Sequence, residues 1–427
     1  MLILENALAP NWDVGGFLCL DACQTPKNPY ILGVSIQMNK PPKHILPIIV
    51  VAQFCCTSLW FASNGVMQDL VYNFGLGTSA VGTLTSAVQF GFISGTLLFA
   101  LLTLTDRFSP SKVFLVCALW GAASNALLLW EGNSTITLFV FRYLTGFFLA
   151  GIYPVGMKIA ADYFDKGLGT SLGYLVGALV VGTAFPHLLK NFDQLLSWQQ
   201  VITITSVLAL SGGVLIWTLV PNGPYRKPSQ QLQLTAFFQV FKNRQFKVAA
   251  FGYFGHMWEL YALWAFVPVL LTTFAETHSS SLSVPLWSFA VIGVGGLACM
   301  LGGHIARNKG SKSTARTALL LSGCCCVLLP LVFVWGKPYF FLAFLLFWGM
   351  VVAADSPQFS TLVAQNAIPE LKGTALTIVN CIGFAISIVS LQLLSFLLQQ
   401  TPSIWTYTLL ALGPAFGLYH LITKKGD

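Results

Sequence analysis

The sequence contains little charge. Only 8% of its 427 residues are Asp, Glu, Lys or Arg, whereas soluble domains carry about 25%. With 56% hydrophobic residues and a mean hydropathy of +0.74, the chain cannot cover itself with a wetted surface. A transmembrane β-barrel is disfavoured as well, because the apolar runs are long and continuous instead of alternating. The composition therefore indicates a polytopic helical membrane protein.

Motifs of ATP hydrolysis and of hydrolase chemistry are also missing. The chain has no Walker phosphate loop, no Gly-x-Ser-x-Gly motif and no His-Glu-x-x-His motif. Its ten cysteines lie mostly within apolar runs and show no metal-ligand spacing with histidine, so we interpret them as small lipid-buried side chains. We expect no enzyme, no cofactor and no metal site. The energy for any transport must then come from an ion gradient or from the solute's own gradient.

The chain does contain twelve apolar runs of membrane-spanning length. A helix needs about 20 apolar residues to cross about 30 Å of hydrocarbon. The runs are 45–66, 79–103, 113–130, 135–161, 168–189, 199–220, 248–273, 285–305, 317–334, 339–363, 374–398 and 404–422. They predict an all-α membrane protein with twelve transmembrane helices.

A short charged loop follows the second run and occurs again after the eighth. The first copy contains Arg107 and Lys112, and the second contains Arg307 and Lys312 at the same spacing, 200 residues later. A repeat of this period, carried by hydrophobic segments, indicates two related membrane halves. We therefore predict two pseudo-symmetric bundles of six helices.

The repeat divides the chain into four segments. Residues 38–220 and 247–427 are the predicted six-helix bundles. Between them, the cytoplasmic linker 221–246 has apolar residues at helical spacing beside basic ones, which predicts an interfacial helix lying on the membrane. Residues 1–37 lack the pattern of a signal peptide. We expect a poorly ordered N-terminal extension there, with Met38 as the natural start. A genuine amphipathic segment is the alternative.

Basic residues indicate the orientation of the chain. With the N-terminus inside, 18 Lys and Arg residues of the loops and termini lie in the cytoplasm, and only Lys190 and Lys337 lie outside. We expect a multi-pass protein of the cell (inner) membrane with both termini cytoplasmic. The net charge of +8 comes from these loops, so we expect no nucleic-acid partner.

The order of these features resembles the major facilitator superfamily from Met38 to the C-terminus. In that family the loop after span two reads Gly, three residues, Asp-Arg, then Gly and basic residues. Asp106, Arg107 and Lys112 match this motif, whereas Leu102 stands at the first Gly. The resemblance implies the major facilitator fold and transport by alternating access.

Span four carries a second part of the resemblance. The family has an Arg early in this span ahead of a Gly-rich run, which matches Arg142 and Gly146, and Pro154 has a counterpart in Pro357 of span ten. Among branches, the sequence looks similar to the nitrate/nitrite and cyanate porters. The nitrate porters place an Arg inside spans two and eight, and neither span contains one here.

Charges at the cytoplasmic helix ends form, by the same resemblance, clusters between the halves that hold the inside closed while the outside is open. These gate residues are Asp106, Arg107, Lys112, Arg307 and Lys312. The alternative is that they only set the topology, as positive loops do in any inner-membrane protein.

Four titratable or charged residues lie inside the predicted spans, where a charge costs about 2.5–3.5 kcal/mol at a helix centre. Arg142 offers fixed donors for a carboxylate or a planar oxyanion, or it is a structural bridge between helices. Glu259 can exchange a proton near neutral pH, and His256 on the same helical face makes the two a candidate proton relay. The alternative is a Glu259 that only bonds a neighbouring hydroxyl. Asp355 is either a second proton site or a cap for the kink at Pro357.

Neutral polar residues within the spans can face a central cavity or join helices. These are Asn64, Gln89, Asn125 and Asn380. Tryptophans within the spans can line such a cavity, but we interpret them as packing or interface residues. They are Trp60, Trp258, Trp264, Trp287 and Trp348. A Gly-x-x-x-Gly stripe along span five predicts close helix contact, and spans two, five, eight and eleven meet between the halves in the resembling family. The stripe is Gly169, Gly173 and Gly177.

Together these features predict a secondary active transporter that moves a small solute, with a small anion as the working hypothesis, by proton-coupled alternating access. Glu259 assisted by His256 is the preferred proton site, and Arg142 is the preferred anchor. The expected partners are a small-molecule substrate, protons and membrane lipids, and the protein is expected to be a monomer. One alternative is a proton-antiport exporter of drugs or metabolites in which Arg142 pairs with Asp355 or Glu259. The others are a uniporter and a non-transporting sensor or assembly protein.

Overall fold

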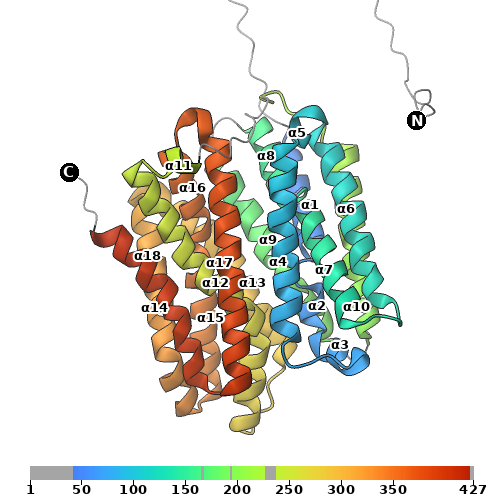
Figure 1. Cartoon of the computed structure of the whole chain (residues 1–427), viewed down its shortest axis with the longest axis vertical. Coiled ribbons are helices and arrows are strands. Elements are labelled where there is room, and N and C mark those ends of the chain that lie inside the picture. Colours follow the sequence, from blue (N-terminus) through green and yellow to red (C-terminus); the bar gives the residue numbers. More distant parts are fainter. Residues whose placement is uncertain (1–41, 165–167, 193–194, 227–236, 424–427) are drawn as a thin grey trace, which may run out of the picture. The chain divides into compact units, whose positions relative to one another are not determined.

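Every element of regular structure in the described part of the chain is a helix (Figure 1). The computed structural model describes residues 42–164, 168–192, 195–226 and 237–423, which belong to one compact unit, Pro41–Asp427. The predicted N-terminal extension and most of the predicted linker helix lie outside the described residues. The all-α class is confirmed.

The helices fall into two groups on either side of the segment 227–236. The first half (residues 42–226) contains α1 (Ile45–Thr57), α2 (Ala62–Gly65), α3 (Met67–Phe74), α4 (Ala80–Leu101), α5 (Leu104–Arg107), α6 (Pro110–Ala126), η1 (Leu127–Leu129), α7 (Thr135–Leu149), α8 (Tyr153–Tyr163), α9 (Leu168–Lys190) and α10 (Trp198–Leu219). The second half (residues 237–423) contains α11 (Phe237–Val240), α12 (Arg244–Thr277), α13 (Val284–Lys309), α14 (Ser311–Trp335), α15 (Pro338–Ala354), α16 (Ser356–Asn366), η3 (Pro369–Leu371), α17 (Lys372–Gln400), η4 (Ile404–Ala411) and α18 (Leu412–Thr423).

Ten helical stretches of the described residues are long and apolar enough to cross a membrane, and they coincide with the second to the eleventh predicted runs. The first predicted run is broken into α1, α2 and α3, and the last is divided between η4 and α18. At a rise of about 1.5 Å per residue, the 13 residues of α1 cover only about 20 Å. The first and the last spans are thus divided into pieces, each too short to cross a membrane as one continuous helix.

Spans four and ten are broken at related positions. α7 gives way to α8 just before Pro154, and α15 gives way to α16 just before Pro357. Proline has no amide proton and clashes with the preceding turn, so it starts a helix readily and interrupts one in its middle. The two prolines lie 203 residues apart.

The same offset relates two close helix contacts. A Cβ added at Gly146 of α7 would overlap the carbonyl oxygen of Val88 on α4, and one at Gly349 of α15 would overlap that of Val291 on α13. Both the two glycines and the two valines are 203 residues apart. Such contacts need glycine because the facing backbone cannot move away from a side chain. The halves therefore share one packing scheme, as the repeat of the charged loops predicts.

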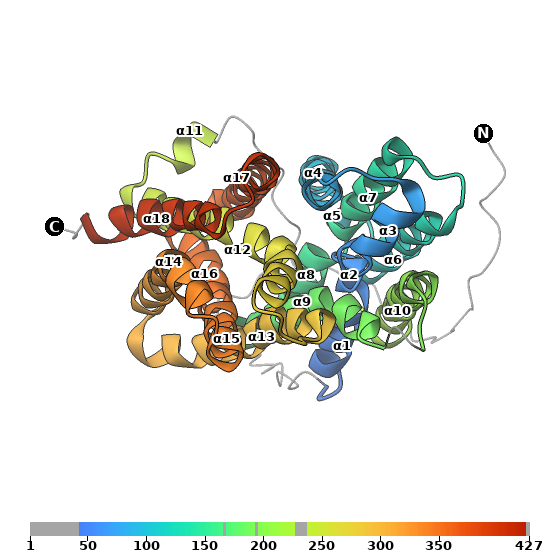
Figure 2. The ribbon, with the colours of Figure 1, turned by 90° about the horizontal axis from the view of Figure 1, so that it is seen from below.

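Two helix pairs join the halves. α9 packs along α13, and α4 packs along α17, as Figures 1 and 2 show. In the first pair, the Cβ of an alanine at Gly177 would lie 2.9 Å from the carbonyl oxygen of Gly296, so the two backbones approach closely at this point. We call the contact between the two halves the seam.

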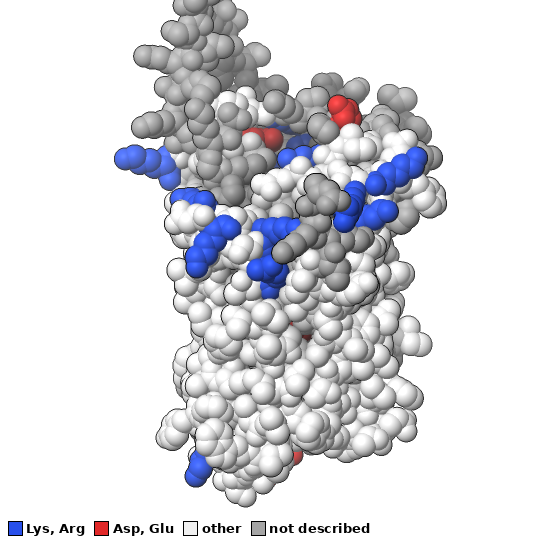
Figure 3. All heavy atoms as spheres, turned by 90° about the vertical axis from the view of Figure 1, so that its left-hand side faces the viewer, with Lys and Arg blue, Asp and Glu red and all other residues white. Residues whose placement is uncertain are grey.

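Charged side chains gather at one end of the helices. Figure 3 shows Lys and Arg at this end, above a broad band of the visible face with almost no charge. We call it the basic end, and it carries Arg107, Lys112, Lys242, Arg244, Arg307, Lys312, Arg316 and Lys372. The opposite end, here the far end, carries Asp69, Lys190 and Lys337. An uncharged band between charged ends fits a helix bundle that spans a bilayer.

Candidate functional site

Arg142 lies beside the break in the first span. Its side chain is fully buried on α7. Nη2 donates to the carbonyl oxygens of Leu59 (3.1 Å) and Trp60 (2.5 Å), in the turn between α1 and α2. Nη1 donates to Oδ1 of Asn125 on α6 (3.1 Å). The guanidinium thus fixes the interrupted span against two neighbouring helices, near the C-terminal end of α1 where a cation is favourable.

No carboxylate of the described chain lies within ion-pair distance of Arg142. The pairing with Asp355 or Glu259 considered above is therefore wrong, because both carboxylates belong to the second half and contact other groups. The acceptors of Arg142 are all neutral, and its Nε has no hydrogen-bond partner in the described residues. A fully buried cation is thus left without a counter-charge among the residues that the structure describes.

Glu259 accepts hydrogen bonds from three side chains. Its Oε1 accepts from Nε1 of Trp348 (2.6 Å) and Sγ of Cys326 (3.3 Å), and its Oε2 accepts from Oγ of Ser322 (2.9 Å). All four residues are buried. The carboxyl group thus joins α12 to α14 through Ser322 and Cys326 and to α15 through Trp348. The bond to Ser322 is the hydroxyl contact that the sequence analysis gave as the alternative to a proton relay.

His256 contacts Asp355 and not Glu259. Nδ1 of His256 lies 2.8 Å from Oδ1 of Asp355, and both side chains are almost completely buried. Nε2 of the ring and Oδ2 of the carboxylate have no hydrogen-bond partner in the described residues. The sequence-based pairing of His256 with Glu259 as a relay is replaced by the pair His256–Asp355, and Glu259 lies next to it on α12.

Asp355 occupies the break in span ten, between α15 and α16. Its side chain makes no capping hydrogen bond to the following helix, so the interpretation as a cap is wrong. The carboxylate instead faces α12, because the turn before Pro357 directs it to His256. A titratable pair therefore lies at the point where the helix is interrupted.

The neutral polar residues join helices. Nδ2 of Asn64 donates to Thr85 (2.8 Å), and Oδ1 of Asn380 accepts from the hydroxyl of Tyr253 (3.0 Å). Asn125 donates to Ile202, Thr205 and Ser206 of α10 while it accepts from Arg142. Oε1 of Gln89 accepts from Ser387 across the seam (3.1 Å). Each of the four therefore has a bond between helices, which was one of the two interpretations.

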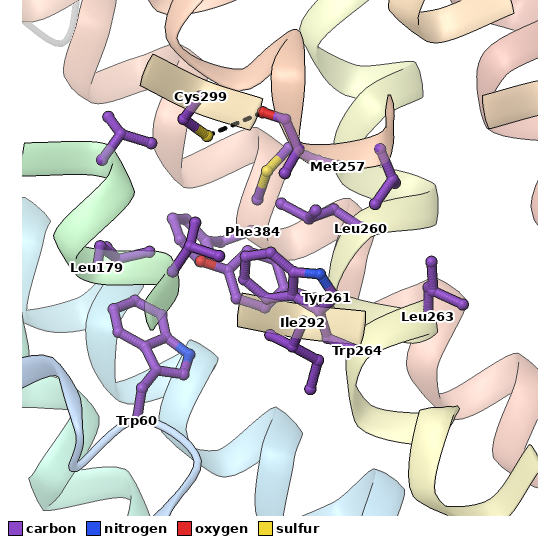
Figure 4. Packing of buried hydrophobic residues seen from close by; sticks show 14 of the residues in the cluster. Trp60, Leu179, Met257, Leu260, Tyr261, Leu263, Trp264, Ile292, Cys299 and Phe384 are labelled. Carbon is purple, nitrogen blue, oxygen red and sulfur yellow. Dashed lines mark hydrogen bonds between the residues drawn. The ribbon is translucent and has the colours of Figure 1, made fainter. Parts of the chain in front are cut away.

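Five aromatic side chains, of which the sequence pointed only to Trp60 and Trp264, form a cluster across the seam that we call the aromatic stack. The ring of Tyr261 lies 5.8 Å from that of Trp60, at 24°, and 5.5 Å from that of Trp264. Phe384 lies 5.7 Å from Trp60 and 4.7 Å from Phe92. Figure 4 shows Trp60 beside Tyr261, Trp264 and Phe384. Trp60 and Phe92 belong to the first half and the other three to the second, so the stack closes the seam with rings from both sides.

From this stack, contacts between α4 and α17 continue toward the far end. Oγ of Ser387 donates to Gln89, and Nε2 of Gln392 donates to the carbonyl of Gly82 (3.0 Å) and to Oγ of Ser86 (2.9 Å). Each step is about one helical turn closer to the start of α4. In the described residues, the hydrogen bonds between these two helices are confined to this stretch.

The far end also holds α9 close to the second half. Oγ of Ser283, just before α13, donates to Oδ1 of Asn191, just after α9 (2.6 Å). Together with the bonds of Ser387 and Gln392, we call this set the far-end contacts. All of them join neutral side chains or backbone.

Comparison with known proteins identifies the family. Residues 49–391 match the model of the Major Facilitator Superfamily. The chain belongs to this superfamily. Members of this superfamily are multi-pass membrane transporters and not enzymes. The branch of the superfamily is not determined by the relatives.

Relatives and a solved structure agree with the superfamily. The chain is 28% identical over 193 residues to the putative uncharacterized transporter YgaY of Escherichia coli K12, a match over 43% of this chain and 48% of YgaY. It thus spans about half the length of that relative. The identity to the uncharacterized MFS-type transporter YceJ of Bacillus subtilis 168 is 23%, over 84% of this chain and 91% of YceJ. The crystal structure of the nucleoside transporter NupG shares the fold, with a TM-score of 0.66 at 14% identity, over 88% of this chain and 98% of NupG.

Of the superfamily's charged loop motif, the described side chains are those of Arg107 and Lys112. Both are exposed, as are Arg307 and Lys312 of the second copy. Arg107, Lys112 and Lys312 make no ion pair within the described residues. The side chain of Asp106 lies outside the described set. The predicted gate therefore stays a prediction.

The glycine stripe of the transporter's fifth span lies on the seam. Gly177 meets Gly296 of α13, while a Cβ at Gly173 would come no closer than 3.9 Å to the carbonyl of Cys299. The side-chain position of Gly169 is outside the described set. The approach of α9 to α13 is thus closest at Gly177, one turn closer to the far end than Gly173.

Proposed function

We propose that this transporter carries a small anion by proton-coupled alternating access, with the basic end in the cytoplasm. The proposed domains are the two six-helix bundles, 38–220 and 247–427, joined by the linker 221–246. The distribution of basic residues supports the orientation, since cytoplasmic loops carry the excess of Lys and Arg. The seam and the shared packing of the halves support rocking of one bundle against the other.

The pair His256–Asp355 carries the proposal of proton coupling. An imidazole and a carboxyl group, both able to bind a proton, lie 2.8 Å apart in a buried site, each with one polar atom that has no partner in the described residues. Uptake of one proton raises the net charge of the pair by one, at the break between α15 and α16. The group that binds the transported proton is therefore this pair. Glu259, whose carboxyl group accepts three hydrogen bonds, instead fixes the position of α12.

Arg142 supports an anionic solute. Its buried charge has only neutral acceptors in the described residues, and an unpaired charge in a low-dielectric site is costly. A negative solute in the seam would lower that cost, whereas a cation would raise it. Arg142 acts as an anchor through its charge, because two of its five N–H donors already bind the break in the first span and a third binds Asn125.

The far-end contacts support the conformation in which the transporter is closed at the far end. They join α4 to α17 and α9 to the start of α13. Alternating access requires a second state in which these bonds open and the basic end closes. The gate residues Asp106, Arg107, Lys112, Arg307 and Lys312 are proposed to hold that second state.

Reconstitution into proteoliposomes containing a pH-sensitive dye tests the proposal. Nitrate, nitrite, cyanate and small carboxylates are added singly, since the first three are cargo of porters that the sequence resembles. An anion that is cargo should move protons into or out of the vesicles. Asp355→Asn and His256→Gln should abolish the proton signal, while Glu259→Gln should retain it.

Three outcomes separate the alternatives. Solute movement without a proton signal would indicate a uniporter, and a proton signal of opposite direction to the solute would indicate antiport. A signal that survives Asp355→Asn but disappears with Glu259→Gln would place the carrier at Glu259. Counterflow of radiolabelled solute at equal pH on both sides checks that each variant still binds and transports.

A further inference from the structure

The aromatic stack is held together across the seam and not within one half. Trp60 lies in the turn between α1 and α2, whereas Tyr261 and Trp264 lie on α12 and Phe384 lies on α17. Rings whose centroids are about 4.5–7 Å apart interact favourably, and all the ring pairs of the stack fall in this range. Any tilt of one half against the other separates Trp60 from Tyr261 and exposes a flat ring face on each side.

Three hydrogen-bond donors that have no acceptor in the described residues border these ring faces. Nε1 of Trp60 and Nε1 of Trp264 have no partner in the described residues, and neither does Nε2 of Gln89. The three side chains are at most 1% exposed. Buried polar groups are nearly always hydrogen-bonded, so three unpaired N–H donors around one seam call for an explanation. An acceptor-rich ligand between the halves would satisfy them.

The charge near Trp60 is positive. Arg142 donates to the backbone carbonyl of Trp60 itself, and no carboxylate of the described chain lies within 4.0 Å of the guanidinium. The carboxylates of the second half, Glu259 and Asp355, contact Trp348 and His256. The two faces of the seam therefore present flat rings and N–H donors, and the first half places a cation without a carboxylate partner in the described residues at the backbone of Trp60.

We propose that the solute is a planar, ring-bearing organic anion that takes the place of the ring contact between Trp60 and Tyr261. A flat ring replaces the lost stacking on both faces, and its anionic oxygens accept from the free N–H donors. This inference rests on the proposed function, because it names the solute class for the same transporter. Sugars and aliphatic acids lack the flat face, and aromatic cations would meet the charge of Arg142.

Calorimetric titration of the full chain in nanodiscs with matched ligands tests the shape. Benzoate and 2-naphthoate are compared with cyclohexanecarboxylate and decahydro-2-naphthoate, which have the same charge and nearly the same size but puckered rings. The flat acids should bind about tenfold more tightly, the gain expected from one stacked contact on each face. Benzamide, flat but neutral, should bind more weakly than benzoate.

Variants of Trp60 locate the contact. Trp60→Phe keeps a ring and removes the N–H, so it should weaken the flat acids and retain their preference over the puckered ones. Trp60→Leu should remove the preference. Trp217→Phe, at a position 52% exposed on α10, is the matched control and should change nothing. Circular dichroism and gel filtration check that each variant folds.

Several results would overturn the inference. Equal affinity for flat and puckered acids would do so, as would a preference that survives Trp60→Leu or no binding of any flat acid at millimolar concentration. The dye assay in proteoliposomes is read separately. If flat acids bind as expected but no anion moves protons, the proposed coupling fails and the solute class stands. If nitrate moves protons while flat acids do not bind, the reverse holds.

Discussion

Replacement of Glu259 tests how the second half is held together. In Glu259→Leu the indole N–H of Trp348 loses its acceptor, whereas Ser322 can still donate to the carbonyl of Leu319 at 3.2 Å. A buried donor without a partner costs about 1–3 kcal/mol, and the thiol of Cys326 adds little because it is a weak donor. We expect the unfolding free energy of Glu259→Leu to fall by about 2 kcal/mol.

Glu259→Gln should behave differently. Its amide oxygen can accept from Trp348 and Cys326, and its amide nitrogen can donate to the hydroxyl of Ser322, so every partner keeps a bond. The free-energy cost should stay below about 1 kcal/mol. The apparent Tm of the leucine variant should therefore lie on the order of 2 °C below that of the glutamine variant.

Thermal unfolding of the purified chain in nanodiscs, followed by intrinsic fluorescence at one scan rate, measures this difference. Glu276→Gln, at an exposed position of the same helix, is the control and should leave Tm unchanged. If the glutamine variant is as unstable as the leucine variant, the charge of Glu259 and not its hydrogen bonding stabilises the second half. Equal Tm values for leucine and wild type would refute the reasoning altogether.

Three other perturbations have expected outcomes. Asn125→Leu should lower the unfolding free energy by about 2–3 kcal/mol, because Arg142 loses a hydrogen bond to a charged group, and the double variant with Arg142→Leu should cost less than the sum in thermal unfolding. Gly349→Ala should reduce the yield of folded protein in gel filtration, since the methyl group meets a backbone carbonyl, whereas Gly303→Ala, with nothing within 4 Å, should be tolerated. Gln392→Leu removes two bonds of about 0.6 kcal/mol each, so hydrogen–deuterium exchange should rise at the far ends of α4 and α17 and not elsewhere.

The helices could be predicted from the sequence because hydrocarbon leaves a strong compositional trace. Runs of about 20 apolar residues and the alternation of basic loops are enough to place spans two to eleven. The break in the first span is different. Residues 58–61 read Ser-Leu-Trp-Phe, without Pro or Gly, so no local signal marks the turn. Arg142 could then be recognised as a buried cation, but not as the residue that binds the interrupted backbone.

The hydrogen-bond partners of the buried side chains could not be predicted from the sequence, for a different reason. His256 lies three residues from Glu259, and helical periodicity puts both on one face, yet His256 contacts the carboxylate of Asp355 while Glu259 accepts from Trp348 and from α14. Helical periodicity predicts the direction in which a side chain leaves its own helix. It does not predict which residues of other helices lie in that direction. The ring of Tyr261 illustrates the same limit, because its stacking on Trp60 depends on how two bundles meet.

The far-end contacts have a consequence for the working conditions of the transporter. They consist of amide, hydroxyl and carbonyl groups, with no charged partner. Dissolved salt screens interactions between exposed charges and leaves bonds between neutral dipoles almost unchanged. Breaking the far-end contacts should therefore cost the same free energy in dilute and in concentrated salt solutions, so any salt dependence of the transport cycle should arise at the charged basic end.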